Sequence, residues 1–135
     1  MKKIFVFAGR HHNSTHESSV ARQFGLDVEF LCEDWKWGND PVAVFRKNLE
    51  VLCGQDFKIV GVAPTGRDES LIPIVEASEE LGVTCYRAIF ARDEENRVKT
   101  LPGGDGRDMV IDHWARMVVT VVKAVRTVED LPWQR

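Results

Sequence analysis

The chain has 135 residues, 44% of them hydrophobic and 29% charged, and a formal net charge of −3 at pH 7. This composition is ordinary for a globular protein, and the length suffices for one domain with its own core. We therefore expect a single domain over residues 1–135. The acidic balance argues against a nucleic-acid partner, which normally requires a basic excess. It leaves room for a small anionic ligand held by a few local cations.

The chain shows no sign of a membrane segment or of a cysteine-based metal site. No apolar run is long enough to cross a bilayer, and the first residues lack the long apolar region and cleavage site of a signal peptide. Cys32, Cys53 and Cys85 form no Cys-x-x-Cys pair and lie in or beside apolar stretches. We expect them to be buried thiols in a reducing compartment. These features predict a cytoplasmic protein with no membrane partner.

Short apolar runs alternate with helical patterns over the first ninety residues or so. Ser14 and Glu17 form a capping-box pattern, and Asp40 precedes Pro41 as a cap precedes a first-turn proline. Glycines end several of the patterns, as they commonly end helices. We expect strands at residues 3–7, 27–31, 57–63 and 84–90, and helices at residues 15–24, 41–53 and 70–81.

Residues 107–127 are predicted to form a long final helix. Apolar side chains recur there at steps of three and four residues, namely Met109, Trp114, Met117, Val118, Val121, Val122 and Val125. The "MVVTVV" segment alone would also suit a strand. The periodicity over the longer window favours the helix.

The expected order is β-α-β-α-β-α-β-α. It predicts an α/β fold of the Rossmann-like or flavodoxin-like type, with a parallel sheet of four to five strands and helices on both faces. In such folds, ligands bind beyond the carboxyl ends of the strands, near the point where the strand order reverses. That rule selects four loops, at residues 8–16, 32–39, 63–69 and 91–106.

The first of these loops has the residues of an anion site. Gly9 permits a tight turn, Arg10 supplies a cation, and the start of the following helix attracts negative charge. The other candidate ligand contacts in this loop are His11, His12, Ser14 and Thr15. An ordinary solvated loop remains an alternative.

The same loop could in principle bind a metal ion through its histidines. His11, His12 and His16 lie close together in the sequence. The capping pattern places the helix start near Ser14, so His11 and His12 fall in the loop and the geometry of paired helical ligands is lost. We predict no metal site.

Acidic and aromatic residues mark the other candidate contacts. Asp68, Glu69 and Glu76 lie near the start of the helix expected at residues 70–81, where a carboxylate could act as nucleophile or base, or could simply complement the helix dipole. Trp35 could stack on a base, cap the core or contact another subunit. Asp112, beside His113, is either a ligand contact or part of an exposed helical face.

Several segments together resemble the nucleoside 2-deoxyribosyltransferase-like superfamily, which includes nucleoside deoxyribosyltransferases and deoxynucleoside-monophosphate N-glycosidases. They are "KIFVFAG" at residues 3–9, "FRKNLEVLCGQDFKIVGV" at 45–62, the acidic loop and helix, and "RDMVIDHWARMVVTVVKAVRTVEDL" at 107–131. Asn48 and Asp56 match family positions before the apolar strand. Glu76, followed by Ala77-Ser78, is the best match to the nucleophile position, and Glu69 is the second.

The resemblance implies cleavage or transfer of the N-glycosidic bond of a nucleoside or nucleotide. Glu76 would attack the anomeric carbon, Asp68 would orient sugar hydroxyls, and no cofactor would be needed. Two alternatives remain open, a non-catalytic nucleotide-sensing module of the same fold and a metal-dependent hydrolase that uses the loop histidines. We also expect a homodimer or higher homo-oligomer, because apolar residues such as Val119 fall outside the main stripe of the predicted last helix.

Overall fold

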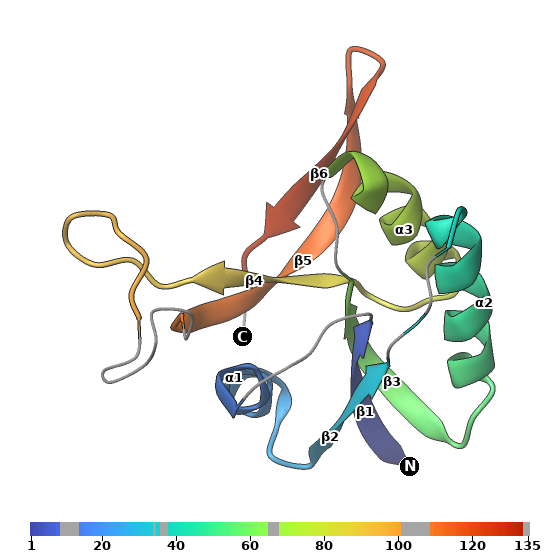
Figure 1. The fold of residues 1–135 in the computed structure, drawn as a ribbon, viewed down its shortest axis with the longest axis horizontal. Helices are drawn as coiled ribbons and strands as arrows, with labels where there is room; N and C mark the ends of the chain where they lie inside the picture. Colours follow the sequence, from blue (N-terminus) through green and yellow to red (C-terminus); the bar gives the residue numbers. More distant parts are fainter. Residues whose placement is uncertain (9–13, 34, 36–37, 65–67, 101–108, 134–135) are drawn as a thin grey trace.

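The protein is an α/β structure with two small sheets and three helices, seen in a computed structural model (Figure 1). The structure describes residues 1–8, 14–33, 35, 38–64, 68–100 and 109–133. Its elements are β1 (Lys2–Ala8), α1 (Ser14–Phe24), β2 (Val28–Glu33), α2 (Pro41–Cys53), β3 (Phe57–Ala63), α3 (Asp68–Glu80), β4 (Tyr86–Phe90), β5 (Ile111–Val122) and β6 (Val125–Leu131). None of the helices in the described part is long and apolar enough to cross a membrane.

The first three strands form a parallel sheet in the order β2-β1-β3. Because β1 is the central strand, its side chains are buried on both faces and alternate between two cores. Ile4 and Val6 pack with the apolar residues of α2 and α3, whereas Phe5 and Phe7 pack with Val20 of α1. Thus α1 covers one face of the sheet, and α2 and α3 cover the other (Figure 1).

The prediction of a final helix at residues 107–127 is wrong. Within that range, Ile111–Val122 is the long strand β5, and β6 pairs with it antiparallel from Val125 onwards. Lys123 and Ala124 both have positive φ, at 50° and 65°, which is the geometry of a two-residue hairpin turn. The density of β-branched residues around this turn therefore prevails over the helical spacing.

The predicted parallel sheet of four to five strands is also wrong. The fourth strand, β4, is joined to β3 by a single parallel bridge between Val62 and Cys85 and then pairs antiparallel with β5. A separate antiparallel sheet of order β4-β5-β6 results. The chain is therefore not a Rossmann-like or flavodoxin-like sheet throughout. The physical reason is that β5 is a strand of 12 residues, which offers its backbone to both β4 and β6, so β4 pairs with it in place of extending the parallel sheet.

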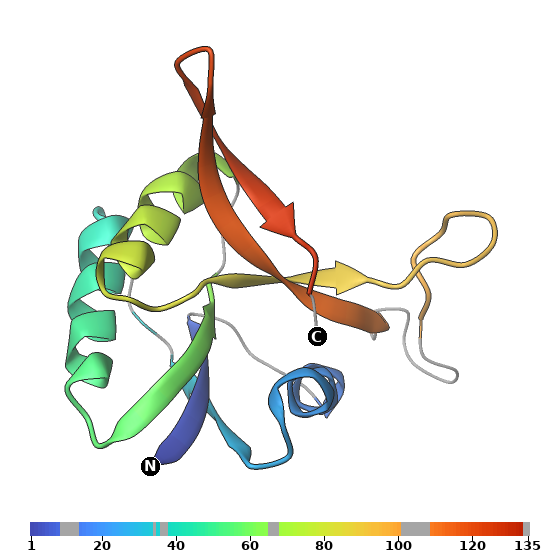
Figure 2. The same ribbon diagram turned by 180° about the vertical axis from the view of Figure 1, so that it is seen from behind.

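Trp114 of β5 joins the antiparallel sheet to the rest of the molecule. Its indole is 1% exposed and contacts the rings of Phe5 and Phe7, with centroid separations of 5.4 and 5.9 Å. Its Nε1 donates to Ser19 Oγ at 2.8 Å, while Gln23 accepts from its backbone N–H at 2.7 Å and donates to its carbonyl at 2.8 Å. Helix α1 is thereby clamped between the two sheets. The tip of the β5–β6 hairpin extends away from this core (Figure 2).

Candidate functional site

The strand order β2-β1-β3 identifies the carboxyl ends of β1 and β3 as the candidate ligand edge. After β1 the chain goes to β2 on one side, and it then crosses to β3 on the other, so the order reverses between β1 and β3. In open α/β sheets, ligands bind at this reversal. Ala8 and Ala63 end the two strands and are buried. The rule therefore selects the segments that follow these two alanines.

Helices α1 and α3 both begin just beyond this edge. Helix α1 starts at Ser14 and α3 at Asp68, so free backbone N–H groups and the positive ends of two dipoles lie after β1 and β3. Thr15 is half-buried in the first turn of α1. The expected contacts Gly9, Arg10, His11 and His12 lie outside the described residues, and the structure describes only the backbone of Ser14, Asp68 and Glu69.

Glu76 lies away from the start of α3. It lies eight positions after Asp68, which is about 12 Å along a helix at 1.5 Å per residue. Its Oε1 accepts a hydrogen bond from Arg126 Nη1 of β6 at 2.6 Å, and the two side chains are 38% and 54% exposed. The carboxylate thus joins α3 to the hairpin. Of the three acidic candidates, Asp68 and Glu69 are nearer the ligand edge along the helix.

Three other candidates are not gathered around one point. Trp35 is 6% exposed and packs edge-on against Phe45, with a centroid separation of 5.7 Å, which favours the alternative that it caps the core. Asn48 donates from Nδ2 to the carbonyl of Val44 at 2.8 Å within α2. Asp112 is exposed at the start of β5, not on a helix, and its Oδ2 lies 2.7 Å from Nδ1 of His113.

Among the described residues, no group of three or more histidine, cysteine or acidic side chains could hold a metal ion. His16 lies against the rings of Phe7 and Trp114, each with a centroid separation of 6.1 Å. It therefore forms part of the aromatic packing between α1 and the sheets.

Sequence reasoning missed the residues that meet on the antiparallel sheet. Two cavities lined by described residues, of about 380 and 360 Å³, lie at this sheet and share Arg116. Arg126, the partner of Glu76, was also missed. The signal that could have revealed them is the two-residue alternation of β5, in which Trp114 and Arg116 share one face.

Comparisons of the chain with protein-family models, with curated proteins and with solved structures found no match.

Proposed function

We propose that the chain binds a nucleoside or nucleoside 5′-monophosphate at the carboxyl edge of the parallel sheet and cleaves or transfers its N-glycosidic bond. The observation that supports this proposal is the reversal of strand order between β1 and β3, with α1 and α3 both beginning beside it. Two helix starts favour a phosphate or another anion. The acidic residues at the start of α3 supply the second chemical requirement, a carboxylate near the sugar.

In the proposed mechanism, a carboxylate of α3 attacks the anomeric carbon and the base leaves with the electrons of the N-glycosidic bond. Water, or a second base, then attacks the glycosyl ester and regenerates the carboxylate. Glu76 and Glu69 are the candidate nucleophiles, and Asp68 orients the sugar hydroxyls. Arg10, Ser14 and Thr15 bind the 5′-phosphate. To act as nucleophile, Glu76 has to exchange its hydrogen bond to Arg126 for the substrate.

The test is release of free base from a panel of nucleosides and nucleoside 5′-monophosphates, followed by chromatography. We expect release to be lost in Glu76→Gln or in Glu69→Gln, and to persist in Glu80→Gln, a control on the same helix whose carboxylate pairs with Arg46. No base release from any member of the panel contradicts the enzymatic proposal. Release that requires added metal and stops with EDTA instead supports a metal-dependent hydrolase.

A second candidate function is a nucleotide-binding module without catalysis. It is favoured by the ion pair between Glu76 and Arg126, which engages the carboxylate that best matches the nucleophile position. Saturable binding of a nucleoside 5′-monophosphate without release of base, measured by calorimetry and chromatography on the same sample, supports this candidate. Turnover of the bound nucleotide contradicts it.

We also propose that the chain forms a homodimer or higher homo-oligomer through the β5–β6 hairpin. Val119 does not support this, because it pairs with Val128 within the hairpin and packs against the core. The support comes from three exposed apolar side chains near the turn, Val121, Val122 and Val125, which are 63%, 62% and 59% exposed. Sedimentation equilibrium of the wild type and of Val122→Thr tests the proposal. A monomeric wild type contradicts it.

A further inference from the structure

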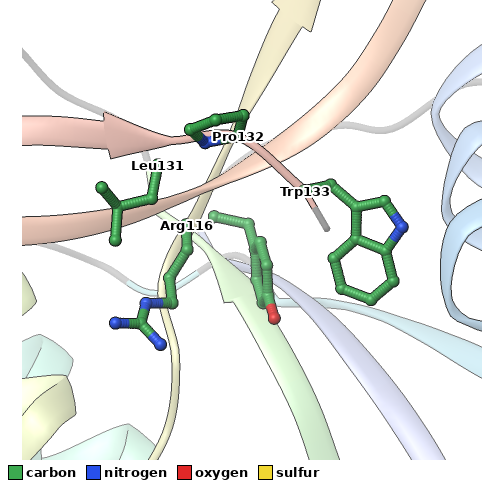
Figure 3. A pocket seen from close by; sticks show the side chains of 5 residues that line it. Arg116, Leu131, Pro132 and Trp133 are labelled. Carbon is green, nitrogen blue, oxygen red and sulfur yellow. The ribbon is translucent and has the colours of Figure 1, made fainter. Parts of the chain in front are cut away.

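A cavity of about 380 Å³ lies on the antiparallel sheet, and we call it the Arg116 pocket (Figure 3). Its lining residues are Tyr86, Arg116, Leu131, Pro132 and Trp133. None of them follows β1, β2 or β3 directly, so the pocket is built from a different part of the chain than the candidate nucleotide site. Its volume falls at the lower end of the range of small-molecule sites.

The register of the sheet places three of the lining residues in one row. Tyr86 of β4 is directly opposite Arg116 of β5, and Arg116 is opposite Leu131 of β6. Residues opposite one another in an antiparallel sheet project from the same face, so the row forms a continuous surface. The backbone therefore fixes the positions from which these three side chains project.

Trp133 forms a wall of the pocket and is fixed by aromatic contacts. In Figure 3, the indole of Trp133 and the guanidinium of Arg116 lie on opposite sides of the pocket. Phe24 of α1 holds Trp133 edge-on, with a centroid separation of 5.5 Å, and it holds Tyr86 in the same way at 4.9 Å. Trp133 as a residue is still 39% exposed, so Phe24 does not cover it completely.

Arg116 differs from the other arginines in the part of the chain that the structure describes. Each of the others donates to a carboxylate or a backbone carbonyl, as seen for Arg22, Arg46, Arg87, Arg92, Arg97 and Arg126. Arg116 is exposed and has no such partner among the described residues. Within the described part of the chain, the guanidinium at the pocket is thus a positive charge without a carboxylate or carbonyl partner.

Tyr86 supplies a second polar group to the pocket. The residue is 9% exposed, and its hydroxyl has no hydrogen-bond partner among the described residues. Burial raises the pKa of the phenol above its ordinary value, and the nearby charge of Arg116 lowers it by less. The hydroxyl therefore stays protonated at neutral pH and can donate a hydrogen bond beside the guanidinium.

We propose that the Arg116 pocket binds a small planar aromatic carboxylate. A guanidinium matches a carboxylate with two parallel hydrogen bonds, and a flat ring can lie against the indole of Trp133. A carboxylate is favoured over a phosphate monoester because the described residues that line the pocket include one cation, which balances one negative charge. The aliphatic surface of Leu131 and Pro132 accommodates the rest of the ring.

The first experiment uses the unmodified protein and three probes, measured by isothermal titration calorimetry. Naphthoate has both a flat ring and the charge, naphthamide keeps the ring without the charge, and decalin carboxylate keeps the charge without the flat ring. We expect saturable binding of naphthoate with a dissociation constant of about 1 mM, in keeping with its size, and at least tenfold weaker binding of the other two probes. Absence of saturable naphthoate binding overturns the proposal, and so does equal binding of naphthamide.

The second experiment locates the bound probe with matched variants. Arg116→Gln is expected to weaken naphthoate binding at least tenfold, and Trp133→Leu is expected to weaken it several-fold. Arg46→Gln, which removes the same charge from the helical side of the molecule, is expected to leave it unchanged. Unchanged binding in Arg116→Gln, or tighter binding of inorganic phosphate than of naphthoate by the wild type, overturns the proposal.

Discussion

Replacement of Gly61 by alanine tests the packing of β3 against the start of β4. An added Cβ at Gly61 would meet Cε2 and Cδ2 of Tyr86 at 2.6 and 2.7 Å and Cε2 of Phe5 at 3.0 Å. Both rings are buried, with exposures of 9% and 0%, so neither can move aside into solvent. Overpacking of this kind costs about 1–3 kcal/mol. The reduced entropy of the unfolded chain returns about 0.4–1 kcal/mol.

We therefore expect Gly61→Ala to lower the free energy of unfolding by about 1–2 kcal/mol. In urea denaturation followed by circular dichroism, this corresponds to a midpoint lower by about 0.5–1 M at an unchanged m-value. Gly54→Ala is the matched control, because its Cβ would lie 3.5 Å from the nearest atom, the carbonyl oxygen of Val51, and its φ of −82° suits alanine. The control should have the stability of the wild type or slightly more.

A double variant separates the clash from other effects of the substitution. In a Tyr86→Val background, two of the three close contacts are absent, so Gly61→Ala should cost less than about 0.5 kcal/mol. The described contact of the Tyr86 ring with Gly61 is contradicted if the full loss in the free energy of unfolding persists in that background. It is also contradicted if Gly61→Ala alone is as stable as the wild type.

Three further predictions concern contacts of the two sheets. Gln23→Ala leaves the backbone N–H and carbonyl of Trp114 without their partner, so it should lower the free energy of unfolding in urea by about 1–3 kcal/mol. The exposed Gln55→Ala is the control and should lower it by under about 0.5 kcal/mol. Equal effects would contradict the hydrogen bonds that join α1 to β5. A double-mutant cycle of Glu76→Gln and Arg126→Gln should give a coupling energy of about 0.2–1 kcal/mol that shrinks in high salt, because both side chains are substantially exposed. A larger coupling energy that does not depend on salt would contradict the description of this ion pair as a surface contact. Burial raises the pKa of the Cys85 thiol to about 12, so only the unfolded state ionises this thiol between about pH 9 and 12, and the free energy of unfolding should fall there by up to about 1.4 kcal/mol per pH unit. Urea titrations of the wild type and of Cys85→Ala should show a shallower decline in the variant, and identical slopes would count against the buried thiol.

The elements up to α3 follow from local signals in the sequence. Asp40 caps α2 by accepting from the N–H of Ala43 at 3.1 Å, and Pro41 takes the first turn. Gly25 and Gly82 end the patterns of α1 and α3 with φ of 125° and 73°, a region that disfavours other residues. Such signals act within a few residues of one another, so they can be recognised without knowledge of the tertiary fold.

The antiparallel sheet could not be recognised in this way, because its cause is not local. The hairpin turn is Lys123-Ala124, which lacks the Asn-Gly or Asp-Gly signal of a two-residue turn. The pairing of β4 with β5 joins segments on opposite sides of residues 91–110, and no spacing rule in the sequence specifies it. A valine-rich stretch fits both a helical stripe and a strand until its partner is known.

The two candidate sites also differ in whether local sequence signals predict them. The candidate ligand edge after β1 and β3 was accessible to prediction, because the alternation of strands and helices implies parallel βαβ units with a common carboxyl edge. The Arg116 pocket was not accessible, because Tyr86, Arg116 and Trp133 meet only through the register of an unforeseen sheet. Likewise, the link from Glu76 to Arg126 needs the hairpin to lie over α3.

Titration of nitrogen-15-labelled protein with a nucleoside 5′-monophosphate, followed by NMR, tests the central claim most directly. The account predicts saturable shifts of the amide signals of Ala8, Thr15 and Ala63, which surround the reversal of strand order, with little change at Tyr86 and Arg116. Absence of any shift at the ends of β1 and β3, or shifts confined to the antiparallel sheet, would contradict it.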